Sequence, residues 1–346
     1  MHTFDYSFLK GLGLTPAFSK RLSRIEVYRE NSKHFVENNA DVVSDMIGVA
    51  KVMSVRESNA IEGIGTHDAR LFDLLSNKVR PLGHDEYELL GYRDALERIH
   101  TDHDEMDVDE ETILSIFSTL VSYIDIEPAF KRSNNEVVER DQDGRVTRRF
   151  KTVPAKDVDD AMFQLVSAFM EARADMGINN LLLIPCFIMD FLKIHPFMDG
   201  NGRISRLLTT LLLYQEGYDV CAYVSLEAII NQSKDDYYEA LAQSGEGWFD
   251  DINDYMPIID YFIGVIFLAY REFDRRMAMC VGKGSKQERV EQALLNIFIP
   301  ISKSALCSLM PDISEAYVEL VIARLVKEGR IEKIGVKKGT RYIPVR

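Results

Sequence analysis

The residues best able to do chemistry lie in one short segment of this 346-residue chain, His195-Pro-Phe-Met-Asp-Gly-Asn-Gly-Arg-Ile-Ser-Arg206. A histidine side chain ordinarily titrates near neutral pH, so His195 could act as a general base. Asp199 is the type of ligand that Mg²⁺ takes together with phosphate oxygens. Arg203 and Arg206 would share one face of a helix, from which both can bind phosphate oxygens. The segment therefore predicts a site for a nucleotide triphosphate.

Two glycines and an amide stand between these groups. Gly200 and Gly202 can adopt positive φ angles and bring bare backbone close to a ligand. If a helix restarts near Arg203, the preceding N–H groups point outward with the positive helix end behind them. Gly200, Asn201 and Gly202 would then form an anion-binding loop. A Gly-Asn-Gly segment alone is typical of an ordinary turn, and a lone histidine after an apolar helix is typical of a core, but their combination with Asp199 and two arginines favours a site.

The segment lies between two apolar runs, Leu181–Ile194 and Leu207–Tyr214. Two buried helices joined by a tight polar loop would produce this pattern and would hold the polar groups on a rigid scaffold. Phe197 is expected in the core, where it would anchor the loop. The helices that we expect here lie near 155–174, 185–194 and 203–215, with Gly217 ending the last.

The segment resembles the signature of the Fic family, His-x-Phe-x-Asp/Glu-Gly-Asn-Gly-Arg-x-x-Arg, at every defined position. The resemblance implies a compact helical core and the transfer of AMP from Mg²⁺-bound ATP to a hydroxyl side chain of a protein. It implies that His195 deprotonates the target hydroxyl and that Asp199 carries Mg²⁺. Arg203 and Arg206 would hold the outer phosphates, and the Gly-Asn-Gly loop would form the anion hole.

A second segment, Ser58-Asn-Ala-Ile-Glu-Gly63, follows apolar residues at helical spacing, so Glu62 is expected at the end of a helix. Alone, this pattern is that of an ordinary helix C-terminus. Beside the Fic signature it resembles the inhibitory motif Ser/Thr-x-x-x-Glu-Gly/Asn of that family. The resemblance implies that Glu62 pairs with Arg206 in place of the γ-phosphate, since a carboxylate and a phosphate oxygen compete for the same guanidinium. Ser58 would support Glu62 by a hydrogen bond.

Two further patterns bear on the site. Val137-Val138 and Val146-Thr147 flank the turn residues 141–144, which predicts a β-hairpin. Fic cores resemble this arrangement in carrying a hairpin flap here, which would present the target hydroxyl to the histidine by strand addition. Tyr237 or Tyr238 could line an adenine pocket, although core packing explains them almost as well.

Residues 284–346 predict three short helices, 289–299, 302–309 and 314–328, and then a β-ribbon turning at 337–339, an order that resembles a winged helix. This part carries 11 Lys and Arg against 7 Asp and Glu, so its basic wing residues could contact DNA. However, Glu315 and Glu319 begin the expected recognition helix and would repel phosphates. A protein-contact or dimerisation module is therefore favoured over DNA binding. The basic wing residues are Lys333, Lys337, Lys338 and Arg341.

Composition restricts the class of protein. Hydrophobic residues make up 46% of the chain, enough for a sizeable core, and the net charge of −14 argues against a protein that coats nucleic acid. The four cysteines show neither pairing nor metal-binding spacing and are expected to be reduced. The first residues lack the basic and apolar parts of a signal peptide, and 181–194 is too short for a membrane span. We therefore expect a cytoplasmic protein without membrane contact.

These patterns together predict a mainly α protein in three parts: an N-terminal helical region with the inhibitory helix (1–105), a Fic catalytic core with a hairpin flap (106–281) and a small winged helix (284–346). The predicted function is a protein adenylyltransferase that uses ATP and Mg²⁺ and is inhibited by Glu62. The alternatives are a bifunctional enzyme that also removes AMP and a winged-helix transcription regulator that senses nucleotides in the Fic pocket. The presence of His195 counts against a pure sensor, because phosphate binding alone needs no base. The target protein and the modified residue are not predicted, and a homodimer stays open.

Overall fold

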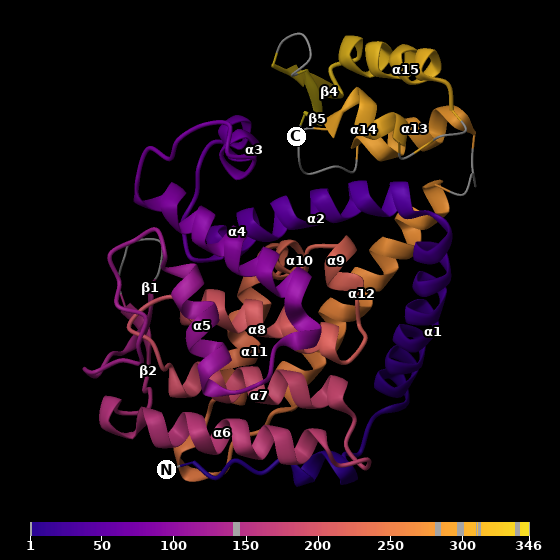
Figure 1. Cartoon of the computed structure of the whole chain (residues 1–346). Helices are drawn as coiled ribbons and strands as arrows, with labels where there is room; N and C mark the ends of the chain where they lie inside the picture. Colours follow the sequence, from indigo (N-terminus) through magenta and orange to yellow (C-terminus); the bar gives the residue numbers. More distant parts are fainter. Residues whose placement is uncertain are drawn as a thin grey trace.

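The structure is a computed structural model that describes residues 2–140, 146–280, 285–295, 301–308, 310, 313–335 and 340–345. It is mainly helical, as the sequence predicted (Figure 1). The N-terminal elements are η1 (Ser7–Gly11), α1 (Pro16–Asn38), α2 (Ala40–Ile61), α3 (Asp68–Leu75), α4 (His84–Asp102) and η2 (His103–Glu105). The central elements are α5 (Glu110–Leu120), β1 (Val137–Arg140), β2 (Val146–Phe150), η3 (Ala155–Asp157), α6 (Val158–Arg173), α7 (Asn180–Ile194), α8 (Asn201–Gln215), α9 (Val220–Tyr223), α10 (Leu226–Gln232), α11 (Lys234–Ser244), η4 (Trp248–Asp250) and α12 (Met256–Cys280).

Helices α7 and α8 form the centre of the core and are buried along nearly their whole length. Helix α7 begins at Asn180, where the side chain of Asn179 accepts the N–H of Leu181, so the start expected at 185 was wrong. Pro185 lies inside this helix. Helix α8 begins at Asn201, two residues before the expected restart, because Gly200 caps it in the left-handed region with φ +82°.

The other long helices surround this pair. Helix α12 packs against α1, α7 and α11, while α2 packs against α4, α9 and α10. Helices α4 and α5 cross so closely that a Cβ atom on Gly91 would lie 1.9 Å from the carbonyl oxygen of Leu120. Only a glycine fits at this crossing, which brings α4 directly against the end of α5.

The predicted hairpin is confirmed. Strands β1 and β2 pair antiparallel, from Val137 opposite Phe150 to Arg140 opposite Val146. The predicted turn residues 141–144 lie outside the described residues. In Figure 1 the hairpin stands at the side of the core, next to α5.

The C-terminal module has its own hydrophobic core, separate from the large one that contains α7 and α8. It comprises α13 (Lys286–Leu295), β3 (Ile301–Ser302), α14 (Lys303–Ser308), α15 (Glu315–Lys327), β4 (Ile331–Ile334) and β5 (Arg341–Pro344), with the strands in the order β3-β5-β4. The sequence predicted the helices and the β4–β5 ribbon but not β3. The composition break at 282–284 and the turn at 337–339 lie outside the described residues. The winged-helix assignment and the domain boundaries stay predictions.

The module rests on α2, which lies between it and the core (Figure 1). Helix α14 packs against α2, and the guanidinium of Arg341 lies 3.4 Å from the centre of the Phe72 ring. Cys186 and Cys221 are buried and Cys307 is half-buried, all with free thiols. In the part of the chain that the structure describes, no helix is both long and apolar enough to cross a membrane.

Candidate functional site

His195 directly follows α7 in an unusual backbone conformation. Its φ angle of 53° lies in the left-handed region, which non-glycine residues rarely adopt, and its N–H donates to the carbonyl of Phe191 at 2.9 Å. Burial, together with the nearby cation of Lys131, lowers the pKa of the His195 ring to about 4. The ring is therefore neutral at pH 7 and can accept a proton. A hydrogen bond with the backbone of Leu192 orients the ring.

Phe197 and Asn201 fix the loop that follows. Phe197 is fully buried and stacks on Phe117 with ring centres 3.8 Å apart, as the expected core anchor. Its backbone N–H donates to Oδ1 of Asn201 at 2.9 Å, and its carbonyl accepts from Nδ2 of Asn201 at 2.8 Å. The side chain of Asn201 is thus committed to the loop itself.

Asp199 lies at the edge of this loop with 71% of its side chain exposed. One carboxylate oxygen accepts the N–H of Gly200 at 2.6 Å, and the other lies 3.9 Å from Nη2 of Arg203. Among the described residues, no group of three His, Cys, Asp or Glu side chains could hold a metal ion. Mg²⁺ often takes one carboxylate and completes its shell with phosphates and water, so Asp199 fits such an ion only in the presence of a phosphate ligand.

Arg206 is buried and binds the end of α2 through three hydrogen bonds. Its Nη2 donates to Oε1 of Glu62 at 2.8 Å, so the structure contains the ion pair that the sequence predicted. Its Nε donates to the hydroxyl of Ser58 at 2.8 Å, and Nη2 also donates to the carbonyl of Ser58 at 2.9 Å. Ser58 thus accepts hydrogen bonds from Arg206. The sequence had instead predicted a hydrogen bond between Ser58 and Glu62.

Gly202 lies directly under the carboxylate of Glu62. A Cβ atom at Gly202 would lie 2.3 Å from Oε1 of Glu62 and 3.3 Å from Nη1 of Arg206, so any side chain here would collide with the glutamate. Gly63, with φ +81°, ends α2 directly after Glu62, as predicted. The carboxylate of Glu62 therefore occupies the space above the first turn of α8, where the positive end of the helix favours an anion.

Arg203 has a carboxylate partner that the sequence did not reveal. Its Nη1 donates to Oε2 of Glu88 at 3.1 Å, and Oε1 of Glu88 lies 3.0 Å from Nε2 of His84. Glu88 is buried in α4, and a single glutamate within a helical stretch carries no signal that would single it out. The buried Nε of Arg203 makes no hydrogen bond within the described structure.

The end of α2 is also held from the opposite side, which the sequence did not predict. Nζ of Lys234 donates to the carbonyl of Ile61 at 2.6 Å, and Nδ2 of Asn231 donates to Glu57 at 2.6 Å. Tyr237 is buried nearby and Tyr238 is 39% exposed. Their predicted contact with adenine stays a prediction.

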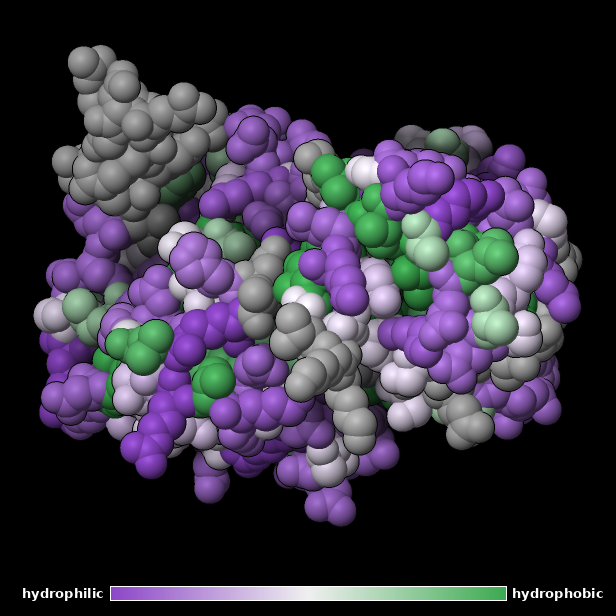
Figure 2. Space-filling view, turned by 90° about the horizontal axis from the view of Figure 1, so that it is seen from above, coloured by the Kyte–Doolittle hydropathy of each residue, from purple (hydrophilic) through white to green (hydrophobic). Residues whose placement is uncertain are grey.

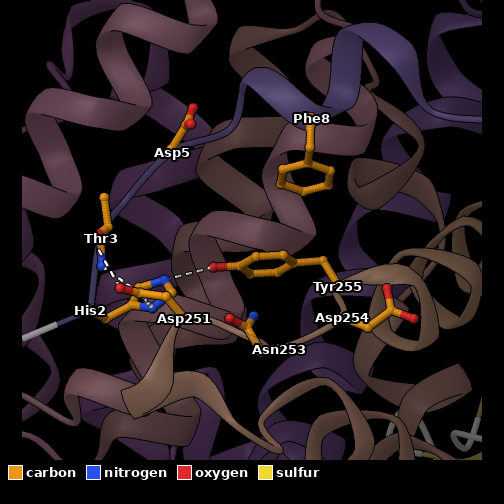
Figure 3. Close-up of a pocket in the computed structure, with 8 residues that line it drawn as sticks. All are labelled: His2, Thr3, Asp5, Phe8, Asp251, Asn253, Asp254 and Tyr255. Atoms are coloured by element: carbon orange, nitrogen blue, oxygen red, sulfur yellow. Dashed lines mark hydrogen bonds and ion pairs between the residues drawn. The ribbon is translucent and has the colours of Figure 1, made fainter.

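A hollow of about 490 Å³ opens elsewhere, beside the first residues of the chain (Figure 3). It shares no residue with the loop 195–206. Behind its wall, the hydroxyls of Tyr6 and Tyr255 and the indole of Trp248 all donate to Asp190 of α7, which is fully buried. Figure 3 shows the ring of His2 beside the hydroxyl of Tyr255, with Nε2 3.1 Å from that oxygen. This network anchors the N-terminal segment to the helix that precedes the histidine.

Comparison with known proteins identifies the part of the chain that carries the site. Residues 107–213 match the model of the Fic/DOC family, a stretch that includes every loop residue discussed above. A Fido domain-containing protein of Dictyostelium discoideum is 27% identical over 84 residues, which are 24% of this chain and 54% of that protein. The match therefore spans only about half the length of this relative.

Solved structures resemble a larger part of the chain. A Fic family protein from Desulfovibrio desulfuricans matches with a TM-score of 0.64 and 20% identity, over 96% of this chain and 97% of that one. A Fic domain-containing signaling protein from Bacteroides thetaiotaomicron matches with a TM-score of 0.58 and 19% identity, over 72% of this chain and 95% of that one. Fic-1 from C. elegans matches with a TM-score of 0.54 and 18% identity, over 75% of this chain and 72% of that one. At these identities the likeness shows the fold, and together with the family match it supports a Fic domain.

Proposed function

We propose that the Fic domain of this chain transfers AMP from ATP to a hydroxyl side chain of another protein. The observation that supports this best is the convergence of a neutral histidine, an exposed carboxylate and two buried arginines at the first turn of α8. Transfer to a hydroxyl needs a base for its proton and positive charge for the departing phosphates. His195 would supply the first, and Arg203 and Arg206 the second.

The reaction exchanges one bond to phosphorus for another. The target oxygen forms a bond to the α-phosphorus, its proton passes to His195, and the bond from the α-phosphorus to the bridging oxygen breaks to release pyrophosphate. Little covalent work is left to the protein, so positioning and charge stabilisation provide most of the rate enhancement. Mg²⁺ bound to Asp199 would add positive charge beside the phosphates.

Glu62 is proposed to inhibit this reaction in the resting protein. Its carboxylate pairs with the guanidinium of Arg206 and fills the space next to Gly202. A γ-phosphate would therefore compete with Glu62 for the same position. The same carboxylate could instead align a water molecule for AMP removal, which is the bifunctional alternative. Both proposals depend on Glu62. Its loss should raise AMP transfer under the first, whereas under the second it should also abolish AMP removal from protein that is already modified.

The hairpin is the proposed contact with the target. A two-stranded sheet leaves the outer edge of each strand open to pairing, and an extended target segment could add to such an edge. The nature of the target beyond its hydroxyl group stays open.

The C-terminal module is proposed to contact protein rather than DNA. Glu315 and Glu319, at the start of α15, both form ion pairs with Lys303 of α14, the first at 2.7 Å. The cation of Lys303 is thus already paired with carboxylates rather than available to DNA phosphates. Leu320 on α15 is 63% exposed. Figure 2, which looks down on the molecule from above, shows hydrophobic residues among hydrophilic ones on this upper face. Arg341, a predicted wing residue, packs on Phe72 instead.

The test is the intact mass of the protein after incubation with Mg²⁺ and ATP. Gain of one AMP in Glu62→Gly, and none in the Glu62→Gly, His195→Ala double variant, is the expected result. Parallel incubations with GTP, CTP and UTP would show which base the site accepts. Absence of any nucleotide adduct on Glu62→Gly, and on a panel of candidate target proteins added to it, would overturn the proposal.

A further inference from the structure

We propose that Lys131 is a positioning residue for His195, which fixes the backbone on both sides of the histidine and connects it to the hairpin. The inference rests on the proposed function, because it concerns the base of that reaction. Lys131 stands in the segment that leads from α5 into β1, more than sixty residues before the histidine in sequence.

Lys131 is a buried lysine with only 3% of its surface exposed. Its Nζ donates to the carbonyl of Ile194 at 3.3 Å, to Oδ1 of Asn135 at 2.8 Å and to the hydroxyl of Thr152 at 3.1 Å. Three acceptors satisfy the three donors of an ammonium group. Its backbone N–H donates to the carbonyl of Pro196 at 2.7 Å. One residue thus binds the carbonyls of the two residues on either side of the histidine.

The partners of Lys131 extend this contact to both ends of the hairpin. Nδ2 of Asn135 donates to the carbonyl of Phe197 at 3.1 Å, and the hydroxyl of Thr152 donates to the carbonyl of Asn135 at 2.9 Å. The N–H of Val153 donates to the carbonyl of Lys193 at 3.4 Å. We call Lys131, Asn135 and Thr152 the flap anchor. The segments before β1 and after β2 meet at the flap anchor. Both donate hydrogen bonds to the backbone on either side of His195.

The flap anchor helps to hold the unusual backbone conformation of His195. A non-glycine residue in the left-handed region is strained, and it stays there only when its surroundings hold it. If the peptide groups beside His195 relaxed, the ring would move away from the position that the target oxygen must reach. The charge on Lys131 acts in the same place, because it lowers the pKa of His195 while the carboxylates of Asp199 and Glu62 raise it.

The same geometry couples target binding to the base. A target segment that pairs with the hairpin would contact β1 or β2. The flap anchor connects the ends of these strands to the loop that contains His195. The loss of Lys131 should therefore lower kcat for transfer, whereas the KM for ATP should stay unchanged, since the described hydrogen bonds of Lys131 reach neither arginine.

The kinetic test compares Lys131→Met, Lys131→Arg and Lys156→Met, each in the Glu62→Gly background. Lys156 is an exposed lysine just beyond β2 and serves as the matched control. We expect kcat of Lys131→Met to fall at least about tenfold, since small misplacements of catalytic groups have effects of this size or larger. Lys131→Arg, which keeps the charge, should recover part of the rate, and Lys156→Met should equal the parent. Thr152→Val removes one acceptor of Lys131 and should show the same trend if Lys131→Met does not fold.

A second measurement is independent of transfer. The ring nitrogens of ¹⁵N-labelled histidine are followed by NMR against pH, with the His195 signal assigned from its loss in His195→Ala. In Lys131→Met the pKa of His195 should rise above about 4, and in Lys156→Met it should not. If the pKa moves but no variant transfers AMP, the proposed function fails and the positioning role stands. If a folded Lys131→Met keeps both the parental kcat and the parental His195 titration, the role of Lys131 is refuted.

Discussion

Replacing Glu62 by glycine should raise both the productive affinity for ATP and the rate of AMP transfer. The change removes the 2.8 Å contact between Glu62 and Nη2 of Arg206 but leaves the two bonds from Arg206 to Ser58. A charge-assisted hydrogen bond contributes ~1.5–3 kcal/mol. Because the Glu62 side chain is 33% exposed, solvent screening places this contact in the lower part of that range. The gain should then be roughly ten- to thirtyfold, which corresponds to about 1.5–2 kcal/mol.

Titration calorimetry with ATP and Mg²⁺ gives the affinity, and intact mass against time gives the rate of AMP incorporation. Glu62→Gln keeps the length of the side chain but not its charge, and it should show part of the gain. Glu97→Gln is the matched control, because it removes a 2.7 Å ion pair with Lys51 on the exposed side of α2. Wild-type affinity and wild-type transfer in Glu62→Gly would refute the reasoning and leave 58–63 as an ordinary helix end. AMP removal from pre-modified protein that persists in Glu62→Gly would count against the bifunctional alternative, which needs Glu62.

Four further predictions follow from the site and the C-terminal module. His195→Ala should abolish labelled AMP incorporation while calorimetry finds ATP affinity nearly unchanged, and retained transfer would remove His195 from its role. Because the His195 ring is neutral above its pKa of about 4, the wild-type rate should fall only as the pH approaches that value, and a midpoint near the ordinary histidine pKa of about 6.5 would contradict this. Asp199→Ala should lose the Mg²⁺ dependence of nucleotide binding, so equal dependence in both proteins would speak against Asp199 as the ligand. In fluorescence anisotropy the full chain should bind duplex DNA weakly and with a shallow salt slope, and tight sequence-selective binding at physiological salt would overturn the preference for protein contacts.

The sequence predicted those parts of the site that lie within a recognisable sequence motif. The loop 195–206 and the pair of Glu62 with Arg206 were accessible because residue types and spacing repeat a known arrangement. Glu88 and Lys131 were not accessible, since each meets the loop only through the folding of a distant helix or hairpin. Their residue types are also common on protein surfaces, so no composition signal marks them. The start of α7 expected near 185 was wrong, because the side-chain cap of Asn179 sets the first residue of the helix at Asn180.

Gly202 has a thermodynamic consequence for the whole chain. Its bare backbone lets the carboxylate of Glu62 lie against the first turn of α8. If the proposed function holds, Glu62 and a phosphate would exclude each other, and ATP would bind only the fraction of molecules whose α2 end has moved away. The apparent dissociation constant is the intrinsic one divided by that fraction, so the ten- to thirtyfold gain expected for Glu62→Gly corresponds to a competent fraction of roughly 3–10%. Any contact that steadies this helix end then sets nucleotide affinity from a distance. Lys234 on Ile61 is one such contact, and the packing of α14 on α2 is another. A protein that bound the C-terminal module could thereby change ATP affinity without approaching the nucleotide.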